Sequence, residues 1–328
     1  MDPLNRIKQP IEAELQTYKA LFDEALTHEN DFLGQALSYV RRRKGKMMRP
    51  QLVLLTAKEQ GEVTVHTQRA AVALELLHTA SLVHDDVVDE SAQRRGQQSV
   101  NALYDNKVAV LVGDYLLSIA LQQAAMTQSL KAVDIIARLG GTLSAGEVFQ
   151  LDNIQQEAVT EEAYFHIIAH KTAALFAACG ELGALTAGAD EVAVQRAREL
   201  GQFIGMCFQI RDDIFDYYDS KDIGKPTGND MREGKLTLPI LFVLNDKENP
   251  CPENIVSLAR KAKQQECSEE EIHELITYTR EHGGINYARH AMEEFYKKAE
   301  QYLLSEITEK KYSEALLTYL QYVIGREV

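Results

Sequence analysis

The sequence predicts an all-α protein, a single-domain helical bundle around a central cavity. Apolar residues recur at helical spacing along most of the 328 residues, and no segment alternates convincingly between apolar and polar side chains as a strand would. Ala, Leu, Glu, Gln and Lys are abundant, and only 7 prolines and 19 glycines interrupt the pattern. Because no composition shift, Ser/Gly linker or internal repeat marks a boundary, residues 1–328 are expected to form one domain.

Helix-breaking sequences divide the chain into the expected helices. KGKMMRP before Gln51, GG at 140–141, ENPCPEN at 248–254 and HGG at 282–284 each separate two helical patterns. Between them the apolar residues repeat with the period of a helix. In chain order, we expect helices over residues 8–26, 30–42, 50–60, 65–91, 97–106, 108–128, 130–151, 160–187, 190–220, 235–246, 254–265, 268–281, 283–304 and 311–325.

Composition limits the classes of function. The formal net charge of −14 argues against a protein that binds nucleic acid through a general basic field. The four cysteines have no C-x-x-C spacing and form no disulfide framework in a chain of this length. That usage favours a reducing, cytoplasmic compartment, with Cys179 and Cys207 buried as small apolar residues.

No segment is expected to span a membrane, and the N-terminus has no apolar signal region. The nearest candidate is VAVLVGDYLLSIALQQAAM from Val108, which Asp114 interrupts in its middle. We therefore expect a buried helix there.

Two copies of the pattern Asp-Asp-x-x-Asp carry the clearest functional signal. They are Asp85, Asp86 and Asp89, and Asp212, Asp213 and Asp216. Residues four apart share a helix face, about 6 Å apart along the axis, so each copy places two carboxylates on one stripe. Apolar neighbours flank both copies, and burying such acids is unfavourable unless a cation neutralises them. Mg²⁺ prefers carboxylate oxygens, water and substrate phosphates, so the two motifs predict a diphosphate held by several Mg²⁺ ions in a common cavity. The alternative is a solvated acidic helix face.

Basic residues lie near the first motif and at an earlier turn. Arg94 and Arg95 follow the first motif directly, and arginine offers a planar fork for phosphate. Gly45, Lys46 and Arg49 form a second basic node between two expected helices. Taken locally, this second node is as consistent with an ordinary basic turn at a helix C-terminus.

Other polar residues interrupt apolar helices. His78 lies two turns before the first motif on the same face, and Gln209 shares a stripe with the second. Lys171, followed by Thr172, stands in an apolar run and requires an anionic partner, such as a phosphate.

The longest irregular segment, 219–235, directly follows the second motif. It is polar, and Lys225 and Lys235 lie near its middle and at its end. A long loop beside a site predicts a lid, and a merely disordered loop is the alternative.

Together, these motifs resemble the trans-isoprenyl diphosphate synthases, and are closest to the long-chain octaprenyl and solanesyl members. The resemblance extends from about Gly45 to Pro239 through the phrases GKMMRP, HTASLVHDD, RRG, GDYLL, GEVFQLD, KTA, QIRDD, DIGKPTGND and EGKLTLP. It implies an isoprenoid-synthase type of helical fold and a homodimer. It also implies an apolar product, which could bring the protein to a membrane surface although no lipid anchor is evident.

The resemblance also assigns roles to individual residues. It implies that the six motif aspartates coordinate up to three Mg²⁺ ions. For the allylic diphosphate it implies contacts from Arg94, Lys171, Lys225 and Lys235. For isopentenyl diphosphate it implies contacts from Gly45, Lys46, Arg49, His78 and Arg95. Lys171, Thr172 and Gln209 match positions that face the reacting allylic group.

The implied reaction is a head-to-tail condensation of isopentenyl diphosphate onto an allylic diphosphate, either farnesyl or geranyl diphosphate. Metal ions and cations stabilise the departing diphosphate, and an apolar cavity excludes water from the allylic cation. The double bond of isopentenyl diphosphate then attacks, and a proton is lost. No Ser-His-Asp or Cys-His nucleophile is required.

Small residues before the first motif bear on product length. Ala80 and Ser81 lie about one turn upstream of Asp85, with the medium-sized Leu77 beyond them. The resemblance implies that an aromatic residue there would plug the product tunnel, so we expect a long product of about C30 to C50. A geranylgeranyl or farnesyl product is the alternative if another helix or a dimer partner closes the tunnel.

Three other functions are weighed against this one. A class I terpene cyclase would need Glu at position 220, where this chain has Ser220. A metal-dependent phosphohydrolase, suggested by His84 beside Asp85, does not account for the second motif. A non-catalytic subunit of a heteromeric synthase would have lost aspartates that this chain keeps.

Overall fold

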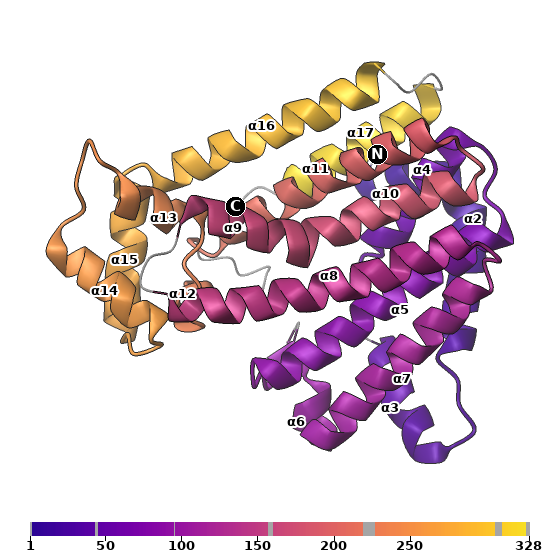
Figure 1. Ribbon diagram of the computed structural model, residues 1–328, viewed down its shortest axis with the longest axis horizontal. Helices are drawn as coiled ribbons and strands as arrows, with labels where there is room; N and C mark the ends of the chain where they lie inside the picture. The colour runs from indigo at the N-terminus through magenta and orange to yellow at the C-terminus, as the bar shows by residue number, and fades with distance from the viewer. Residues whose placement is uncertain are drawn as a thin grey trace. The chain divides into compact units, whose positions relative to one another are not determined.

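A computed structural model describes residues 2–42, 45–94, 96–156, 160–218, 227–305 and 310–325 of the chain. Within these residues the fold is all-α, as predicted (Figure 1). The only strands in the described ranges form one short antiparallel hairpin, which pairs Gln93 with Gln98 and Arg94 with Gln97.

The elements follow one another in this order: α1 (Pro3–Lys8), η1 (Gln9–Ile11), α2 (Glu12–Ala25), α3 (Asp31–Arg42), α4 (Met48–Gln60), α5 (Val65–Val88), β1 (Gln93–Arg94), β2 (Gln97–Gln98), α6 (Val100–Tyr104), α7 (Asn106–Ala125), α8 (Leu130–Gln155), α9 (Glu161–Ile168), η2 (Ala169–Ala173), α10 (Ala174–Thr186), α11 (Glu191–Phe215), α12 (Asn229–Arg232), α13 (Leu238–Asn245), α14 (Glu253–Lys263), α15 (Glu269–Glu281), α16 (Gly284–Ser305) and α17 (Lys310–Ile324).

Most predicted helices have a counterpart, but four details differ. The helix expected over 160–187 is divided by η2, a π-helical turn, and the one expected over 190–220 ends at Phe215. The expected helix over 97–106 begins later, because residues 97–98 belong to the hairpin. The short helices α1 and α12 were not predicted.

The chain groups into two compact units, each assembled from separate stretches. The first unit contains Met1–Gly141, Ala174–Gln202 and Glu300–Tyr322; the second contains Thr142–Ala173, Phe203–Ala299 and Val323–Val328. The two aspartate motifs therefore belong to different units. That the whole chain acts as one domain stays a prediction.

In the first unit, α5 is the helix that touches most others. It contacts α2, α4, α6, α7 and α10, and most of its residues before the aspartate motif are buried. Thr64 caps its start, where its hydroxyl accepts from the N–H of Thr67 at 3.4 Å. Glycine lets α10 approach α4, since a Cβ at Gly183 would lie 2.5 Å from the Val53 carbonyl oxygen.

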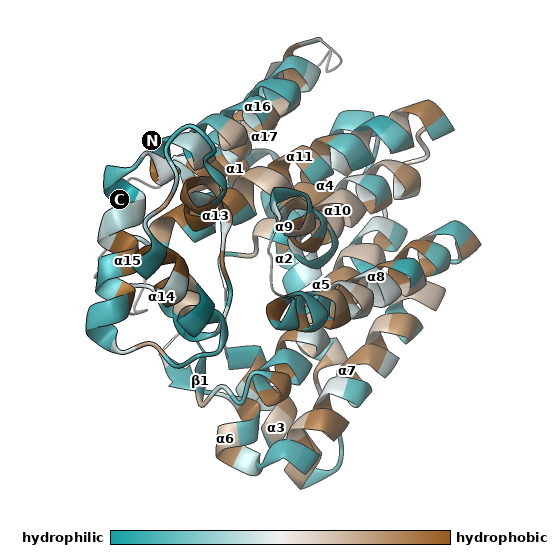
Figure 2. Ribbon diagram, turned by 60° about the vertical axis from the view of Figure 1, so that its left-hand side comes forward, coloured by the Kyte–Doolittle hydropathy of each residue, from teal (hydrophilic) through white to brown (hydrophobic). Residues whose placement is uncertain are grey.

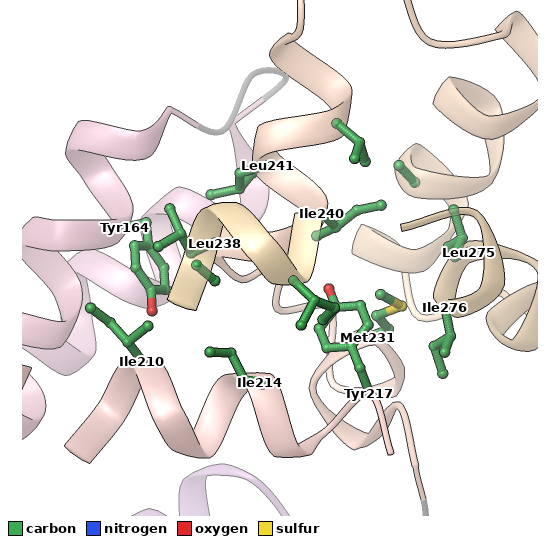
Figure 3. Close-up of a cluster of buried hydrophobic side chains, with 14 of the residues drawn as sticks. Tyr164, Ile210, Ile214, Tyr217, Met231, Leu238, Ile240, Leu241, Leu275 and Ile276 are labelled. Atoms are coloured by element: carbon green, nitrogen blue, oxygen red, sulfur yellow. The ribbon is translucent and has the colours of Figure 1, made fainter. Parts of the chain in front are cut away.

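The second unit has its own apolar core, centred on α13. Five residues of this helix are buried, and it stands out in brown in the hydropathy colouring of Figure 2. Figure 3 shows the side chains of α13 lying between Tyr164 of α9 and Ile276 of α15. Ile210 and Ile214 of α11 pack against the same core, which fixes the helix that leads into the second motif.

Among the described residues, α7 is long and apolar enough to cross a membrane by length and composition alone. It contains nearly all of the stretch from Val108 for which the sequence predicts a buried helix rather than a span. The helix packs along α5, and 44% of its most apolar window is buried. Core helices of water-soluble proteins meet the same criterion, so this finding is weak evidence for a span.

Candidate active site

The first aspartate motif lies where α5 ends. Asp85 and Asp86 belong to the last turn, and Asp89 follows the helix as its C-cap, with its N–H donating to the Asp85 carbonyl at 2.8 Å. Asp85 is half-buried, Asp89 is exposed and Asp86 is fully buried. The three carboxylates thus have three environments, and Asp85 and Asp89 are the two that solvent reaches.

Arg94 binds the buried aspartate of this motif. Its Nε donates to Asp86 Oδ1 at 2.6 Å, and the side-chain amide of Asn101 donates to the Asp86 carbonyl at 3.1 Å. The hairpin of β1 and β2, which turns at Gly96 with a φ of +73°, carries Arg94 back to the helix end. Arg94 was predicted to bind the allylic diphosphate; in the structure its charge neutralises an aspartate. Arg95 lies outside the described residues.

The predicted basic node lies at the start of α4 and contacts the C-terminal helix. Lys46 Nζ donates to the hydroxyl of Tyr322 at 2.7 Å and lies 5.3 Å from the centre of that ring. The Arg49 guanidinium lies 5.7 Å from the ring centre of Phe176, and Gly45 is exposed. Aromatic side chains therefore hold both cations of the node in place.

Several residues just upstream of the first motif are buried within the first unit. Ala80 and Leu77 are buried, and a Cβ at Gly140 of α8 would lie 3.6 Å from Leu77 Cδ1. His78 is also buried, and its carbonyl accepts from the Ser81 hydroxyl at 2.9 Å. Of the two small side chains predicted to leave room for a product, Ala80 is therefore buried in the first unit and Ser81 is half-buried.

The second motif begins in the last turn of α11. Asp212 is exposed, and Asp213 is buried with both carboxylate oxygens occupied. The hydroxyl of Tyr164 donates to Asp213 Oδ2 at 2.5 Å, and the Gln209 amide donates to Oδ1 at 2.7 Å. Burial raises the pKa of Asp213 to about 7, and the neighbouring carboxylates add to the rise while the two hydrogen bonds oppose it.

Asp216 lies just beyond the end of α11 and caps another helix. Its carboxylate accepts from the backbone N–H groups of Asn229 at 2.9 Å and Asp230 at 3.1 Å, at the start of α12. Asp230 is an additional acid that our sequence analysis did not single out. Burial raises the pKa of Asp230, and the charges of Asp216 and Asp213 raise it further. The only sequence signal for this residue was its place in the phrase DIGKPTGND.

A chain of hydrogen bonds joins the π-helical turn to the second motif. Thr172 Oγ1 donates to Gln209 Oε1 at 2.6 Å, and Gln209 in turn binds Asp213. Tyr164 completes the chain on the other carboxylate oxygen. The structure therefore brings Thr172 and Gln209 together, and it adds Tyr164, which no motif had indicated.

The predicted lysines have acidic partners in the second unit. Lys171 forms an ion pair with Glu147 and donates to Gln150 Oε1 at 3.0 Å. Lys235 pairs with Glu233 at 2.6 Å, and its backbone N–H donates to the Asp230 carbonyl at 2.8 Å. Lys225 and residues 219–226 of the predicted lid lie outside the described residues.

The donor sets of both motifs suit a hard cation that keeps part of its water shell. Each motif has an exposed carboxylate, Asp89 in the first and Asp212 in the second. Arg94 pairs with Asp86 of the first motif. The backbone N–H of Lys235 donates to the carbonyl of Asp230, whose own N–H binds Asp216 of the second. In the described part of the chain, no three His, Cys, Asp or Glu side chains form a preorganised metal cage. Mg²⁺ bound through water and substrate phosphate requires no such cage.

Two helices that end in aspartate-rich motifs are the pattern by which the sequence resembles the trans-isoprenyl diphosphate synthases. The chain matches the family described as Polyprenyl synthetase over residues 30–278, and it belongs to that family. It is therefore a prenyltransferase that forms trans-prenyl diphosphates.

Three relatives illustrate this membership. The octaprenyl diphosphate synthase of Haemophilus influenzae is 32% identical over 324 residues, which cover 98% of this chain and 97% of that one. A solved geranylgeranyl pyrophosphate synthase from Bacteroides thetaiotaomicron is 46% identical with a TM-score of 0.86, and the match covers 99% of this chain and 100% of that one. A polyprenyl synthase from Caulobacter crescentus, solved with calcium and isoprenyl diphosphate, is 29% identical with a TM-score of 0.91, covering 99% and 98%.

Proposed function

We propose that this enzyme uses Mg²⁺ to condense isopentenyl diphosphate head-to-tail onto an allylic diphosphate, and that its all-trans product is long, about C30 to C50. The observation that carries the proposal is the pair of intact aspartate motifs, each at a helix end, with Arg94 paired to Asp86 of the first. The calcium and isoprenyl diphosphate of the Caulobacter crescentus enzyme support a divalent ion beside a diphosphate in this family.

A bound divalent ion would neutralise the diphosphate and improve it as a leaving group. In the first unit, Asp85 and Asp89 are the carboxylates that solvent reaches, and Asp86 is neutralised by Arg94. In the second unit, Asp212 is exposed, while Asp213 and Asp216 accept hydrogen bonds from protein donors. We therefore assign direct metal contact mainly to Asp85, Asp89 and Asp212.

The remaining residues bind and orient the two substrates. Lys171 and Lys235 would bind the allylic diphosphate, together with Lys225. Lys46, Arg49 and His78 would bind isopentenyl diphosphate, with Arg95 and the backbone of Gly45. Thr172 and Gln209 would direct their oxygen dipoles at the developing allylic cation, since both are held by hydrogen bonds that restrict their rotation.

Two observations bear on product length. Ala80 is small and buried, and the octaprenyl synthase of Haemophilus influenzae matches almost the whole chain, which favours a long product. The Bacteroides thetaiotaomicron enzyme has the higher identity and is a geranylgeranyl pyrophosphate synthase, which favours C20. The C20 product is therefore the second candidate.

The measured length of the product decides between the long product of about C30 to C50 and the C20 product. The chain would be incubated with Mg²⁺, isopentenyl diphosphate and farnesyl diphosphate, and the dephosphorylated products would be separated by chromatography. We expect a long ladder that Ala80→Phe and Ser81→Phe shorten. A ladder that stops at C20 in the unmodified protein would overturn the long-chain assignment and retain the reaction.

We also propose that the enzyme is a cytoplasmic homodimer, with peripheral membrane contact for product release. Several apolar side chains on α7 and α8 are exposed, among them Leu111 and Val148. Sedimentation that found a fully active monomer would contradict the dimer.

A further inference from the structure

In the second unit, the side chains of Glu147 and Gln150 contact the ammonium group of Lys171 and also contact each other. Lys171 Nζ pairs with Glu147 Oε2 and donates to Gln150 Oε1 at 3.0 Å. The Gln150 amide donates to Glu147 Oε1 at 3.3 Å, which links the two partners to each other. Glu147 and Gln150 lie one turn apart on α8, so one helix face supplies both acceptors.

These contacts are sheltered from solvent. The Lys171 and Glu147 side chains are 23% and 14% exposed, and Gln150 is buried. Water competes weakly with hydrogen bonds at such positions, so their geometry is well defined. A lysine ammonium has three N–H donors, and Glu147 and Gln150 accept two of them. The direction of the third donor is then determined by the other two.

The backbone on either side of the ion pair lets Lys171 and Glu147 approach each other. Lys171 belongs to the π-helical turn, a local widening that often occurs at functional sites. Gly146 lies directly before Glu147, and a Cβ there would lie 2.9 Å from His170 Cβ and 3.1 Å from Lys171 Cγ. Glycine therefore allows α8 to approach the π turn closely enough for Glu147 to reach the ammonium.

We propose that Glu147 is a positioning residue for the allylic substrate. With Gln150, it holds the Lys171 ammonium so that the remaining N–H donates to the diphosphate. The inference rests on the proposed role of Lys171 in binding that diphosphate. A carboxylate this close to a diphosphate also repels it, so the benefit of Glu147 must come from orientation.

Orientation and charge can be separated by substitution. Glu147→Gln keeps an oxygen that accepts from Lys171 and removes the repulsion, so the affinity for the allylic diphosphate should stay within about threefold of the original or increase. Glu147→Ala removes the acceptor, and that affinity should fall roughly tenfold. The affinity for isopentenyl diphosphate should be the same in both variants.

The test is a double-mutant cycle on binding. Dissociation constants of a non-reactive analogue, farnesyl thiodiphosphate with Mg²⁺, would be measured by calorimetry for Glu147→Ala, Lys171→Met and the double variant. If Glu147 acts through Lys171, Glu147→Ala should have no further effect once Lys171 is methionine. Glu181→Ala is the matched control, because Glu181 is also 14% exposed and pairs with Arg138 at 2.9 Å, yet lies in the first unit. It should leave the affinity unchanged.

The outcomes distinguish a failure of the positioning role of Glu147 from a failure of the proposed role of Lys171. If Lys171→Met weakens binding and Glu147→Ala still costs a full tenfold in that background, the positioning role is wrong while the role of Lys171 stands. If Glu147→Gln binds as poorly as Glu147→Ala, orientation is not the cause and the inference fails. If Lys171→Met binds the analogue normally, the proposed role of Lys171 fails and the inference fails with it.

Discussion

At the scale of single residues, the three aspartates of the second motif have different environments. Asp212 is exposed, Asp213 is buried between Tyr164 and Gln209, and Asp216 caps α12. Three identical residues in one motif therefore present different electrostatics to a ligand. The difference comes from partners outside the motif, among them Tyr164 of α9 and the backbone at the start of α12.

Tyr164→Phe tests the buried aspartate. The Tyr164 hydroxyl stabilises ionised Asp213, so its removal should raise the pKa of Asp213 further above about 7. The ionised form needed beside a metal would then appear only at higher pH. We expect activity to fall about tenfold at neutral pH and to recover as the pH rises.

The matched control is another tyrosine–carboxylate pair in the same unit. Tyr287 donates to both oxygens of Glu161 at 2.8 Å, and neither residue belongs to an aspartate motif. Tyr287→Phe should leave the pH–rate profile where it is. An unshifted profile in Tyr164→Phe would contradict the assigned role of the Tyr164 hydroxyl.

The cysteines give a second prediction at this scale. Cys179 and Cys207 are buried as predicted, and burial raises the pKa of Cys207 to about 12 and that of Cys179 well above its usual range. Cys251 and Cys267 are half-buried. Mass spectrometry after iodoacetamide treatment of the native protein at pH 8 should show label only on the latter pair. Labelling of Cys179 before unfolding would disagree with its place in the core.

At the scale of elements, α8 contacts a lysine of the candidate site, and a second lysine binds its C-terminal end. Its residues Glu147 and Gln150 contact Lys171, and Lys263 of α14 binds the carbonyls at its C-terminal end. Lys263 Nζ donates to the Asn153 carbonyl at 3.3 Å and to that of Gln156. A cation at a helix C-terminus satisfies carbonyls that have no partner within the helix.

Lys263→Met should therefore destabilise the protein by about 1 to 3 kcal/mol, because the carbonyls at the end of α8 lose a charged donor. Urea unfolding followed by circular dichroism would measure the change. Lys297→Met is the control: Lys297 is exposed and pairs with Glu294 along α16, so its loss should cost less than about 0.5 kcal/mol. Equal stability of the two variants would rule out the capping role.

The division of the expected helix over 160–187 also belongs to this scale. Apolar periodicity predicts that a helix exists, but the register of α9 and α10 differs by the extra residue of the π turn. This turn carries Lys171 and Thr172. No local pattern in AHKTA distinguishes a π turn from an ordinary one, because the close contact with Gly146 comes from a distant part of the chain.

At the scale of the whole molecule, both aspartate motifs are required by the proposed reaction. Asp85→Ala and Asp212→Ala should each lower turnover at least about a thousandfold, since each removes a carboxylate assigned to metal contact. Circular dichroism should show the helical fold intact. Asp134→Ala, at an exposed position of α8, serves as the control and should keep full turnover. Near-normal turnover in either motif variant would overturn the metal assignment.

The sequence by itself determined the class of fold, most helix positions, the family and the two acidic motifs. It could do so because helical periodicity and the residue types of a metal-dependent diphosphate site are local properties of the chain. Lys171, Thr172 and Gln209 also stood out locally, as polar residues within apolar helices, and their role in the site stays a prediction.

Only the tertiary structure decided what each of these residues contacts. It paired Arg94 with Asp86, Lys46 with Tyr322 and Lys171 with Glu147, and it added Tyr164 and Asp230 to the second motif. Burial and hydrogen bonding depend on helix packing between residues far apart in the sequence, and these contacts set both the pKa of Asp213 and the orientation of the cations.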